Sequence, residues 1–250
     1  MKFRTEGLII KEQNIGEQDK LVHVLTNSNG VIKAFVRGAK NIKGGKAAAT
    51  SLLSYSLLTF HTGRDSYSIG DARTLRVFSK LRGDVKKMCL AQYFCELALT
   101  ICPREKNAEK YLSLVLNSLY LINEDKRPAE LVKPCLEMRL AAMAGYLPDL
   151  IMCRTCGVYT APLTYFFPQT GEIECERCRG SNAGGAVPLT EAALTALRHT
   201  VYADDDKLFS FSLSDEGLEL LNRASEAYLQ YRFEKEFKTL NFYKAITLTT

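Results

Sequence analysis

The sequence lacks features that would place it in several familiar classes of protein. No run approaches the roughly 18 consecutive apolar residues of a membrane helix, and residues 1–6 lead into alternating residues where a signal peptide has an apolar block. We therefore expect a cytoplasmic protein without a membrane partner. His23, His61 and His199 stand alone, with no Gly-x-Ser-x-Gly or His-Glu-x-x-His pattern around them. The sequence offers no catalytic residue, and we do not expect an enzyme.

The composition favours a folded chain in a reducing compartment. The 250 residues are 46% hydrophobic and 24% charged, which suffices for one or two buried cores. A chain of this size does not need disulfides, and four of its eight cysteines form two Cys-x-x-Cys motifs, so a bound metal ion is the better interpretation. The other four follow no ligand pattern and are expected to be buried apolar side chains: Cys89, Cys95, Cys102 and Cys135.

Charge is distributed unevenly along the chain, although the formal net charge is only +5. Residues 1–80 carry +7, residues 81–150 carry +1, residues 151–187 are neutral and residues 188–250 carry −3. A basic first part indicates contact with a polyanion, and the remainder then has another task. Charge alone is equally compatible with a lysine-rich surface that only keeps the protein soluble.

Residues 6–76 have the pattern of short strands, because runs rich in Val, Ile, Leu, Tyr and Phe alternate with turn residues. The turns are too short for crossover helices, so the strands must be mainly antiparallel, and closure into a small barrel removes their exposed edges. We expect an OB-like barrel of five strands, at residues 7–12, 20–26, 31–37, 52–61 and 67–77.

From Val85 onward the apolar residues follow a helical period, which predicts five helices. Thr190 and Ser214 are the expected N-caps of the fourth and fifth, and the fifth is expected to continue to about Thr239. The expected fold class is α+β and multidomain, with a five-stranded OB-like barrel, an all-α domain and an inserted four-cysteine zinc ribbon. The expected domains are the barrel at 1–80, the first helical part at 81–150, the cysteine module at 151–187 and the second helical part at 188–250.

The cysteine module is the most specific motif. Its two Cys-x-x-Cys pairs are separated by 18 residues, the spacing of a zinc ribbon, and together they offer the ligand set of one tetrahedral Zn²⁺: Cys153, Cys156, Cys175 and Cys178. Four protein ligands leave no position for an activated water, so the predicted zinc ion is structural. A redox pair or two disulfides are the alternatives. The aromatic residues at 165–167 are expected to cover the site.

Residues 31–37 predict a strand with one apolar and one cationic face. A period of two puts Ile32, Ala34 and Val36 on one side and the cations and aromatic ring on the other. Cations that hold phosphates beside a ring that stacks on a base are typical of single-strand binding. The following glycine-rich loop adds lysines but is not a Walker A motif, because Ala47 stands where Ser or Thr is needed. The predicted nucleic-acid-binding residues are Lys33, Phe35, Arg37, Lys40, Lys43 and Lys46. The alternative is an exposed loop that lysine keeps soluble.

A series of short motifs occupies the first 40 residues: Gly7-Leu8-Ile9-Ile10, Gly16-Glu17 with Asp19-Lys20, Leu25-Thr26 with Gly30, and Arg37-Gly38-Ala39-Lys40. Together with the order of a basic barrel, a helical body and an inserted pair of Cys-x-x-Cys motifs, they resemble the RecO family of bacterial recombination mediators. The specific motifs lie in the barrel and the cysteine module, and the helices match in order only.

The resemblance implies a nucleoid-associated mediator of DNA repair and homologous recombination. Such a protein binds single- and double-stranded DNA, anneals complementary strands and helps RecR load RecA on DNA coated by single-stranded DNA-binding protein, whose tail its helical domain recognises. Carried over by position, the DNA role falls on Arg37, Lys40 and the loop to Lys46, and the zinc role on the four cysteines. The alternatives are an RNA-binding protein with the same barrel and zinc ribbon, a zinc-dependent nucleic-acid enzyme and a protein-binding adaptor.

Overall fold

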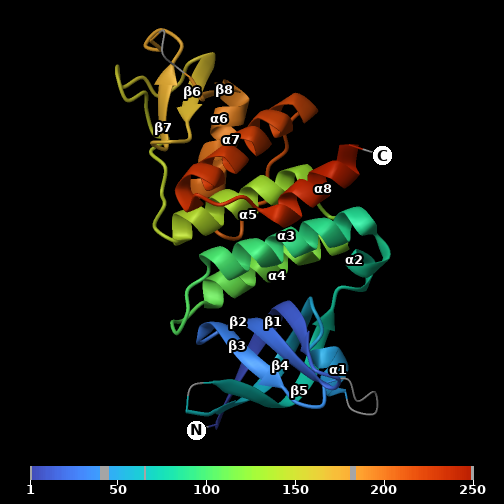
Figure 1. Cartoon of the computed structure of the whole chain (residues 1–250). Coiled ribbons are helices and arrows are strands. Elements are labelled where there is room, and N and C mark those ends of the chain that lie inside the picture. Colours follow the sequence, from blue (N-terminus) through green and yellow to red (C-terminus); the bar gives the residue numbers. More distant parts are fainter. Residues whose placement is uncertain (1, 40–44, 65, 181–183, 249–250) are drawn as a thin grey trace. The chain divides into compact units, whose positions relative to one another are not determined.

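The computed structural model describes residues 2–39, 45–64, 66–180 and 184–248. The chain forms two compact units, coloured along the sequence in Figure 1. Unit 1 consists of Met1–Glu124 with Phe237–Thr250, and unit 2 of Asp125–Glu236. The four domains expected above were defined by the kind of secondary structure along the sequence, whereas these two units are defined by which residues pack together.

Unit 1 begins with a closed five-stranded barrel, which confirms the expected architecture. The strand order is β1-β2-β3-β5-β4, antiparallel throughout except for a short parallel pairing of β3 with β5 at Ala34 and Phe35. Barrel closure leaves few unpaired backbone groups at the edges, and the interior is filled by alternating side chains of all five strands. The strands are β1 Lys2–Ile15, β2 Asp19–Thr26, β3 Gly30–Val36, β4 Ser54–Thr62 and β5 Tyr67–Val77.

The helices of unit 1 follow the barrel in sequence. The longest, α3, begins after Asp84, whose side chain accepts a hydrogen bond from the backbone N–H of Lys87. It is buried on most of its circumference, as expected from apolar residues that occur on most sides of the helix, and it packs against α4, α8 and β1. Two short helices, α1 and α2, were not predicted. The helices are α1 Lys46–Ala49, α2 Ser79–Gly83, α3 Val85–Ile101, α4 Glu109–Asn123 and α8 Lys238–Leu248.

Unit 2 packs three helices with a small antiparallel sheet of order β7-β6-β8. Thr190 and Ser214 cap α6 and α7 as predicted, because their side chains accept hydrogen bonds from the backbone N–H groups of Ala193 and Gly217. Strand β8 was not predicted. The elements are α5 Ala129–Met143, β6 Leu163–Phe167, β7 Glu172–Cys175, β8 Val187–Thr190, α6 Glu191–Tyr202 and α7 Asp215–Phe233.

The predicted extent of the fifth helix is wrong. Helix α7 ends at Phe233, and Glu234 has a φ of 45°, in the left-handed region. A residue in that conformation cannot continue the i→i−4 hydrogen bonds of an α-helix, so the chain turns and starts α8 at Lys238. Thr239, expected at the end of one long helix, lies instead in the first turn of the next one, where its backbone N–H donates to Glu96 of α3.

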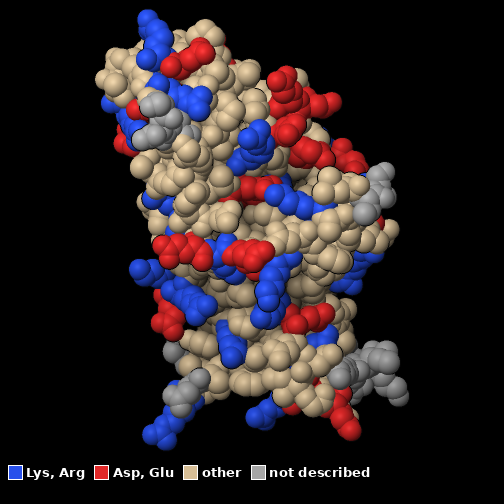
Figure 2. All heavy atoms as spheres, turned by 45° about the horizontal axis from the view of Figure 1, so that its top comes forward, with Lys and Arg blue, Asp and Glu red and all other residues tan. Residues whose placement is uncertain are grey.

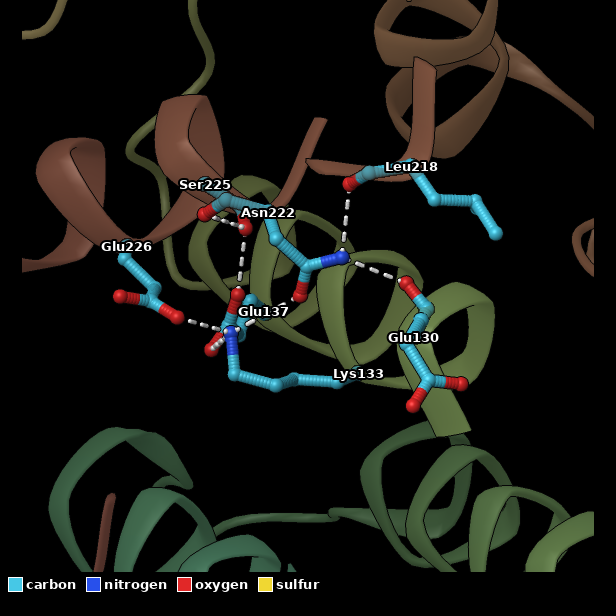
Figure 3. Close-up of polar contacts among 7 residues, drawn as sticks. All are labelled: Glu130, Lys133, Glu137, Leu218, Asn222, Ser225 and Glu226. Atoms are coloured by element: carbon cyan, nitrogen blue, oxygen red, sulfur yellow. Dashed lines mark hydrogen bonds and ion pairs between the residues drawn. The ribbon is translucent and has the colours of Figure 1, made fainter. Parts of the chain in front are cut away.

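A buried ionic network joins α5 to α7 in unit 2 (Figure 3). The ammonium of Lys133 lies 2.9 Å from Glu137 and 2.8 Å from Glu226, and the hydroxyl of Ser225 donates to Glu137. Burial lowers the pKa of Lys133, but the two carboxylates raise it by more, and its pKa is raised overall. The lysine is therefore held charged and paired within the core.

No helix among the described residues is long and apolar enough to cross a membrane. The four cysteines outside the module are buried, as predicted, with at most 6% of each residue exposed. Burial raises the pKa of Cys95 to about 12, which keeps this thiol protonated.

Candidate nucleic-acid surface and metal centre

Strand β3 presents the two faces that its sequence predicts. Ile32, Ala34 and Val36 belong to the interior cluster of the barrel. Lys33 and Phe35 point outward, and Phe35 is 40% exposed, which is unusual for a phenylalanine within a strand. A cation and an accessible ring thus lie two residues apart on one face.

Hydrogen bonds hold the described residues that follow β3 and those that begin α1. Arg37 is exposed directly after the strand, and Gly38 turns the chain with a φ of 63° while its N–H donates to the Asp19 carboxylate at 2.9 Å. Lys46 begins α1 and donates to the carbonyl oxygen of Arg37 at 3.3 Å. Burial lowers the pKa of Lys46, and this effect outweighs that of Asp71 and Asp19, which raise it. The predicted Lys40 and Lys43 lie outside the described residues.

The strand register extends this face from β3 across β2 to β1. Lys33 pairs with His23, and His23 pairs with Lys11, so the three side chains form one row across the outside of the barrel. We call this row the cationic row, after its two lysines. The β-bulge between Ile9 and Lys11 makes this possible, because without the extra residue Lys11 would face inward as Ile9 does. Sequence period alone does not show the bulge, and the prediction therefore missed Lys11.

The rows on either side of the cationic row differ in character. On one side Leu8, Leu25 and Val31 are buried outside the barrel interior, where α3 and α4 pack on β1 and β2. On the other side Leu21 pairs with Phe35, which carries the exposed ring. The outer face therefore changes from a covered apolar row to the row with the two lysines and then to a row that carries the exposed Phe35 ring.

The connection between α3 and α4 brings a further cation to this place. Gly30 forms a bridge with Arg104, and the N–H of Val31 donates to the carbonyl of Pro103 at 2.8 Å. Only glycine fits at position 30, since its φ is 64° and a Cβ would come within 2.1 Å of the Pro103 oxygen. Arg104 acts on the His23 ring together with Lys11 and Lys33: burial first, and then these three cations, lower the pKa of His23. Only the tertiary structure reveals Arg104, because it follows the strand by about 70 residues.

Electrostatically, this surface is suited to anions. Lys11, Lys33 and Arg104 are exposed, and within the described residues none of them forms a salt bridge with a carboxylate. Figure 2 shows Lys and Arg side chains that project from the barrel, alongside a few Asp and Glu side chains, and a group of Asp and Glu side chains on unit 2. This distribution agrees with the charges of +7 for residues 1–80 and −3 for residues 188–250.

The four predicted cysteine ligands converge in unit 2. Their Sγ atoms all lie within 4.8 Å of one another, and the sulfurs of Cys156 and Cys175 are 3.7 Å apart. A tetrahedral ion with sulfur ligands at about 2.3 Å requires sulfur–sulfur distances of about 3.8 Å. The four thiols thus lie close enough together to serve as the ligands of one metal ion.

Backbone hydrogen bonds prepare the first cysteine for metal binding. Burial alone would raise the pKa of the Cys153 thiol, but N–H groups of Cys175, Cys156 and Thr155 donate to its sulfur and lower its pKa to about 6. The N–H of Cys175 lies 3.4 Å from this sulfur. Gly157, with a φ of 72°, closes the first turn by donating to the Cys153 carbonyl.

Two arginines beside the cysteines stack on the aromatic residues of β6. The Arg154 guanidinium lies 4.5 Å from the Phe167 ring and binds Glu174 at 2.9 Å, while Arg179 lies 4.0 Å from the Tyr165 ring. Phe166 alternates to the other face and packs against Tyr228 of α7. Two of the three predicted aromatic residues therefore contact residues that flank the ligands, and the third anchors the sheet to a helix.

Comparison with known proteins places these features in one family. Residues 1–78 match the family model described as the recombination protein O N terminal, and residues 82–241 match that of the recombination protein O C terminal. A DNA repair protein RecO of Acetivibrio thermocellus is 31% identical over 98% of this chain and 97% of its own length. Proteins of the same name from Symbiobacterium thermophilum and Dehalococcoides mccartyi are 30% and 28% identical over 96% and 95% of this chain, and over 96% and 93% of their own lengths.

Proposed function

This chain belongs to the RecO family of DNA repair proteins, and on that premise we propose that it binds single- and double-stranded DNA through the outer face of its barrel. The observation that carries the proposal is the exposed Phe35 ring beside cations that have no carboxylate partner among the described residues. Base stacking on the ring contributes about 1–3 kcal/mol per base, and each phosphate contact releases counterions. Lys33, Phe35, Arg37 and Lys46, with Lys40 and Lys43, are the proposed DNA contacts.

Strand annealing follows from such a surface without a catalytic residue. Two complementary strands repel each other through their phosphates, and a basic surface that binds both lowers this repulsion. The bases remain free to pair as long as the contacts are made to the backbone and to the face of a base. We propose that the protein accelerates pairing in this way and has no enzymatic activity.

We also propose that the four cysteines bind one structural Zn²⁺ per chain. Four thiolates are a donor set typical of closed zinc sites, and the four sulfurs are clustered within 4.8 Å of one another. The ion would supply folding free energy to the module, which has a small core of its own. Arg154, with its ion pairs to Glu172 and Glu174, holds the first cysteine turn on β7.

The partners that we propose rest on membership of the family. They are RecR, the tail of single-stranded DNA-binding protein and, indirectly, RecA during its loading on coated DNA. The place of action would be the nucleoid in the cytoplasm. The helical parts of the chain are the candidates for protein contacts, because the barrel face is the candidate for DNA.

The test is fluorescence anisotropy of labelled single-stranded DNA, double-stranded DNA and RNA across a salt series. We expect binding to DNA whose affinity falls linearly with salt on logarithmic axes, with a shallower slope after Arg37, Lys40, Lys43 and Lys46 are replaced together by Ala. An unchanged slope in this variant would refute the assignment of these residues. Preference for RNA would favour an RNA-binding role, and absence of binding at low salt would favour the adaptor role.

A further inference from the structure

We propose that the barrel has a phosphate-binding subsite at the border with the α3–α4 connection, and that a nucleic-acid phosphate bound there is held with uptake of one proton by His23. The subsite combines side chains of β1, β2, β3 and the connection: Lys11, His23, Lys33 and Arg104. The inference rests on the proposed function. It adds two cations and a titrating ring that the strand and loop of the sequence prediction do not contain.

The first argument is geometric. Cross-strand partners on one face of an antiparallel sheet have Cβ atoms about 5 Å apart, so Lys11 and Lys33 flank the His23 ring from both sides. Arg104, on the connection whose backbone is fixed by the bridge at Gly30, is close enough to act electrostatically on the same ring. Three exposed cations around one ring favour the binding of an anion, and a phosphodiester has the charge and the acceptors for it.

The second argument is the state of the histidine itself. Its Nδ1 is buried and has no hydrogen-bond partner among the described residues. An imidazolium carries protons on both ring nitrogens, so the protein supplies no acceptor for one of them. The charged groups that act on the ring are Lys11 from β1, Lys33 from β3 and Arg104 from the connection, and all are cations. Burial and the neighbouring cations therefore disfavour protonation of His23 in the free protein.

A bound phosphate changes the charges that act on the His23 ring. In the free protein, burial and then the neighbouring cations lower the pKa of His23 below its ordinary value. A phosphate in the subsite offsets the three cations, which after burial are the remaining causes of the lowered pKa, and adds negative charge, so we expect the pKa of His23 to rise on binding. Because the bound state then takes up a proton, the affinity for DNA must rise as the pH falls through the window between the two pKa values.

The contribution of the subsite's cations can be measured from the salt dependence of DNA affinity. We expect Lys11→Ala with Arg104→Ala to lower the slope of log affinity against log salt for single-stranded DNA by about 1.4, since each phosphate contact contributes about 0.7. The matched control is Lys2→Ala with Arg4→Ala, which removes the same charge from exposed positions of β1 that pair with β4. The control should leave the slope within experimental error of the wild type.

The contribution of the His23 ring can be measured from the pH dependence of DNA affinity. Between pH 7.5 and 6, the affinity of the wild type should rise with decreasing pH by up to about tenfold per pH unit, the limit for one proton. His23→Gln should remove this dependence, whereas His61→Gln, at an exposed histidine of β4, should retain it. Thermal unfolding of every variant establishes that the barrel remains folded.

The outcomes separate this inference from the proposed function. If the wild type binds DNA but the Lys11 and Arg104 variant keeps its salt slope, the subsite is refuted while the DNA-binding role stands. If His23→Gln titrates like the wild type, proton uptake by this ring is refuted. If the wild type does not bind DNA at low salt, the proposed function itself has failed.

Discussion

The barrel of unit 1 and the helical core of unit 2 use their cations in opposite ways. On the barrel, Lys33 is exposed and has no carboxylate partner among the described residues. In the core, Lys133 is only 3% exposed and is bound by two carboxylates. Lys33 is therefore available to a ligand, whereas Lys133 is held in ion pairs within the core.

Two arginines of unit 2, Arg198 and Arg154, are also bound by partners within the fold. Arg198 is buried and donates to the carbonyl oxygens of Leu150, Ile151 and Tyr159, which fixes the segment around the first cysteine turn. Arg154 forms two ion pairs beside the same turn. Net charge along the sequence does not distinguish these uses, because a paired and an unpaired cation count equally.

Removal of the proposed Zn²⁺ is expected to have the most different effects on the two regions. Chelation of zinc should unfold residues 151–187, because about 10–16 kcal/mol of binding free energy is coupled to folding in small zinc modules. The affinity of the barrel for DNA should change little, since its cations belong to unit 1. Hydrogen exchange of residues 151–187 and DNA anisotropy on the same sample measure both. A module that stays protected after removal of zinc would contradict the structural role.

Substitution of the same residue type in both regions should give very different losses of stability. Lys133→Met leaves Glu137 buried without its counter-ion and should lower the free energy of unfolding by about 3–5 kcal/mol. Lys33→Met, at an exposed strand position, should change it by at most about 0.5 kcal/mol. Urea unfolding followed by circular dichroism, with hydrogen exchange of α5 and α7, makes the comparison. Equal losses in the two variants would show that the buried network does not stabilise unit 2.

The aromatic ring and the cation of β3 should contribute to DNA binding in distinguishable ways. Phe35→Ala should weaken single-stranded DNA binding by about 1–3 kcal/mol through loss of stacking, with an unchanged salt slope. Lys33→Met should instead reduce the slope by about 0.7 for one lost phosphate contact. Anisotropy at several salt concentrations provides both values. A changed slope for the Phe35 variant would mean that the ring positions phosphate-binding residues and does not stack on a base.

The smallest effect is expected at the start of α7. Ser214→Ala removes the acceptor of the Gly217 N–H and should cost about 1 kcal/mol of stability in unit 2. Ser212→Ala, two residues earlier in the exposed segment before the helix, is the matched control and should be neutral. Thermal unfolding distinguishes the two. Identical melting of the two variants would exclude a contribution of this cap.

Local patterns were sufficient for a large part of this structure. The period of two in β3 predicts which side chains face the core, and the caps at Thr190 and Ser214 predict where α6 and α7 begin. Each of these features depends on residues within one turn or strand, so the sequence contains all the information that is needed. The cysteine spacing also predicts correctly that the four thiols lie close together. Each Cys-x-x-Cys turn brings its own pair together, and the 18 residues between the turns match the spacing of a zinc ribbon.

The sequence by itself thus determined the barrel, the capped helices and the four-cysteine cluster. Only the tertiary structure decided that Lys11 and Arg104 join His23, since this depends on a β-bulge and on a connection some 80 residues away. It also decided that α7 stops at Glu234 and that Lys133 pairs with Glu226, 93 positions along the chain. The physical reason is the same throughout: local periodicity sets which face a residue occupies, but packing between distant segments sets what that face meets.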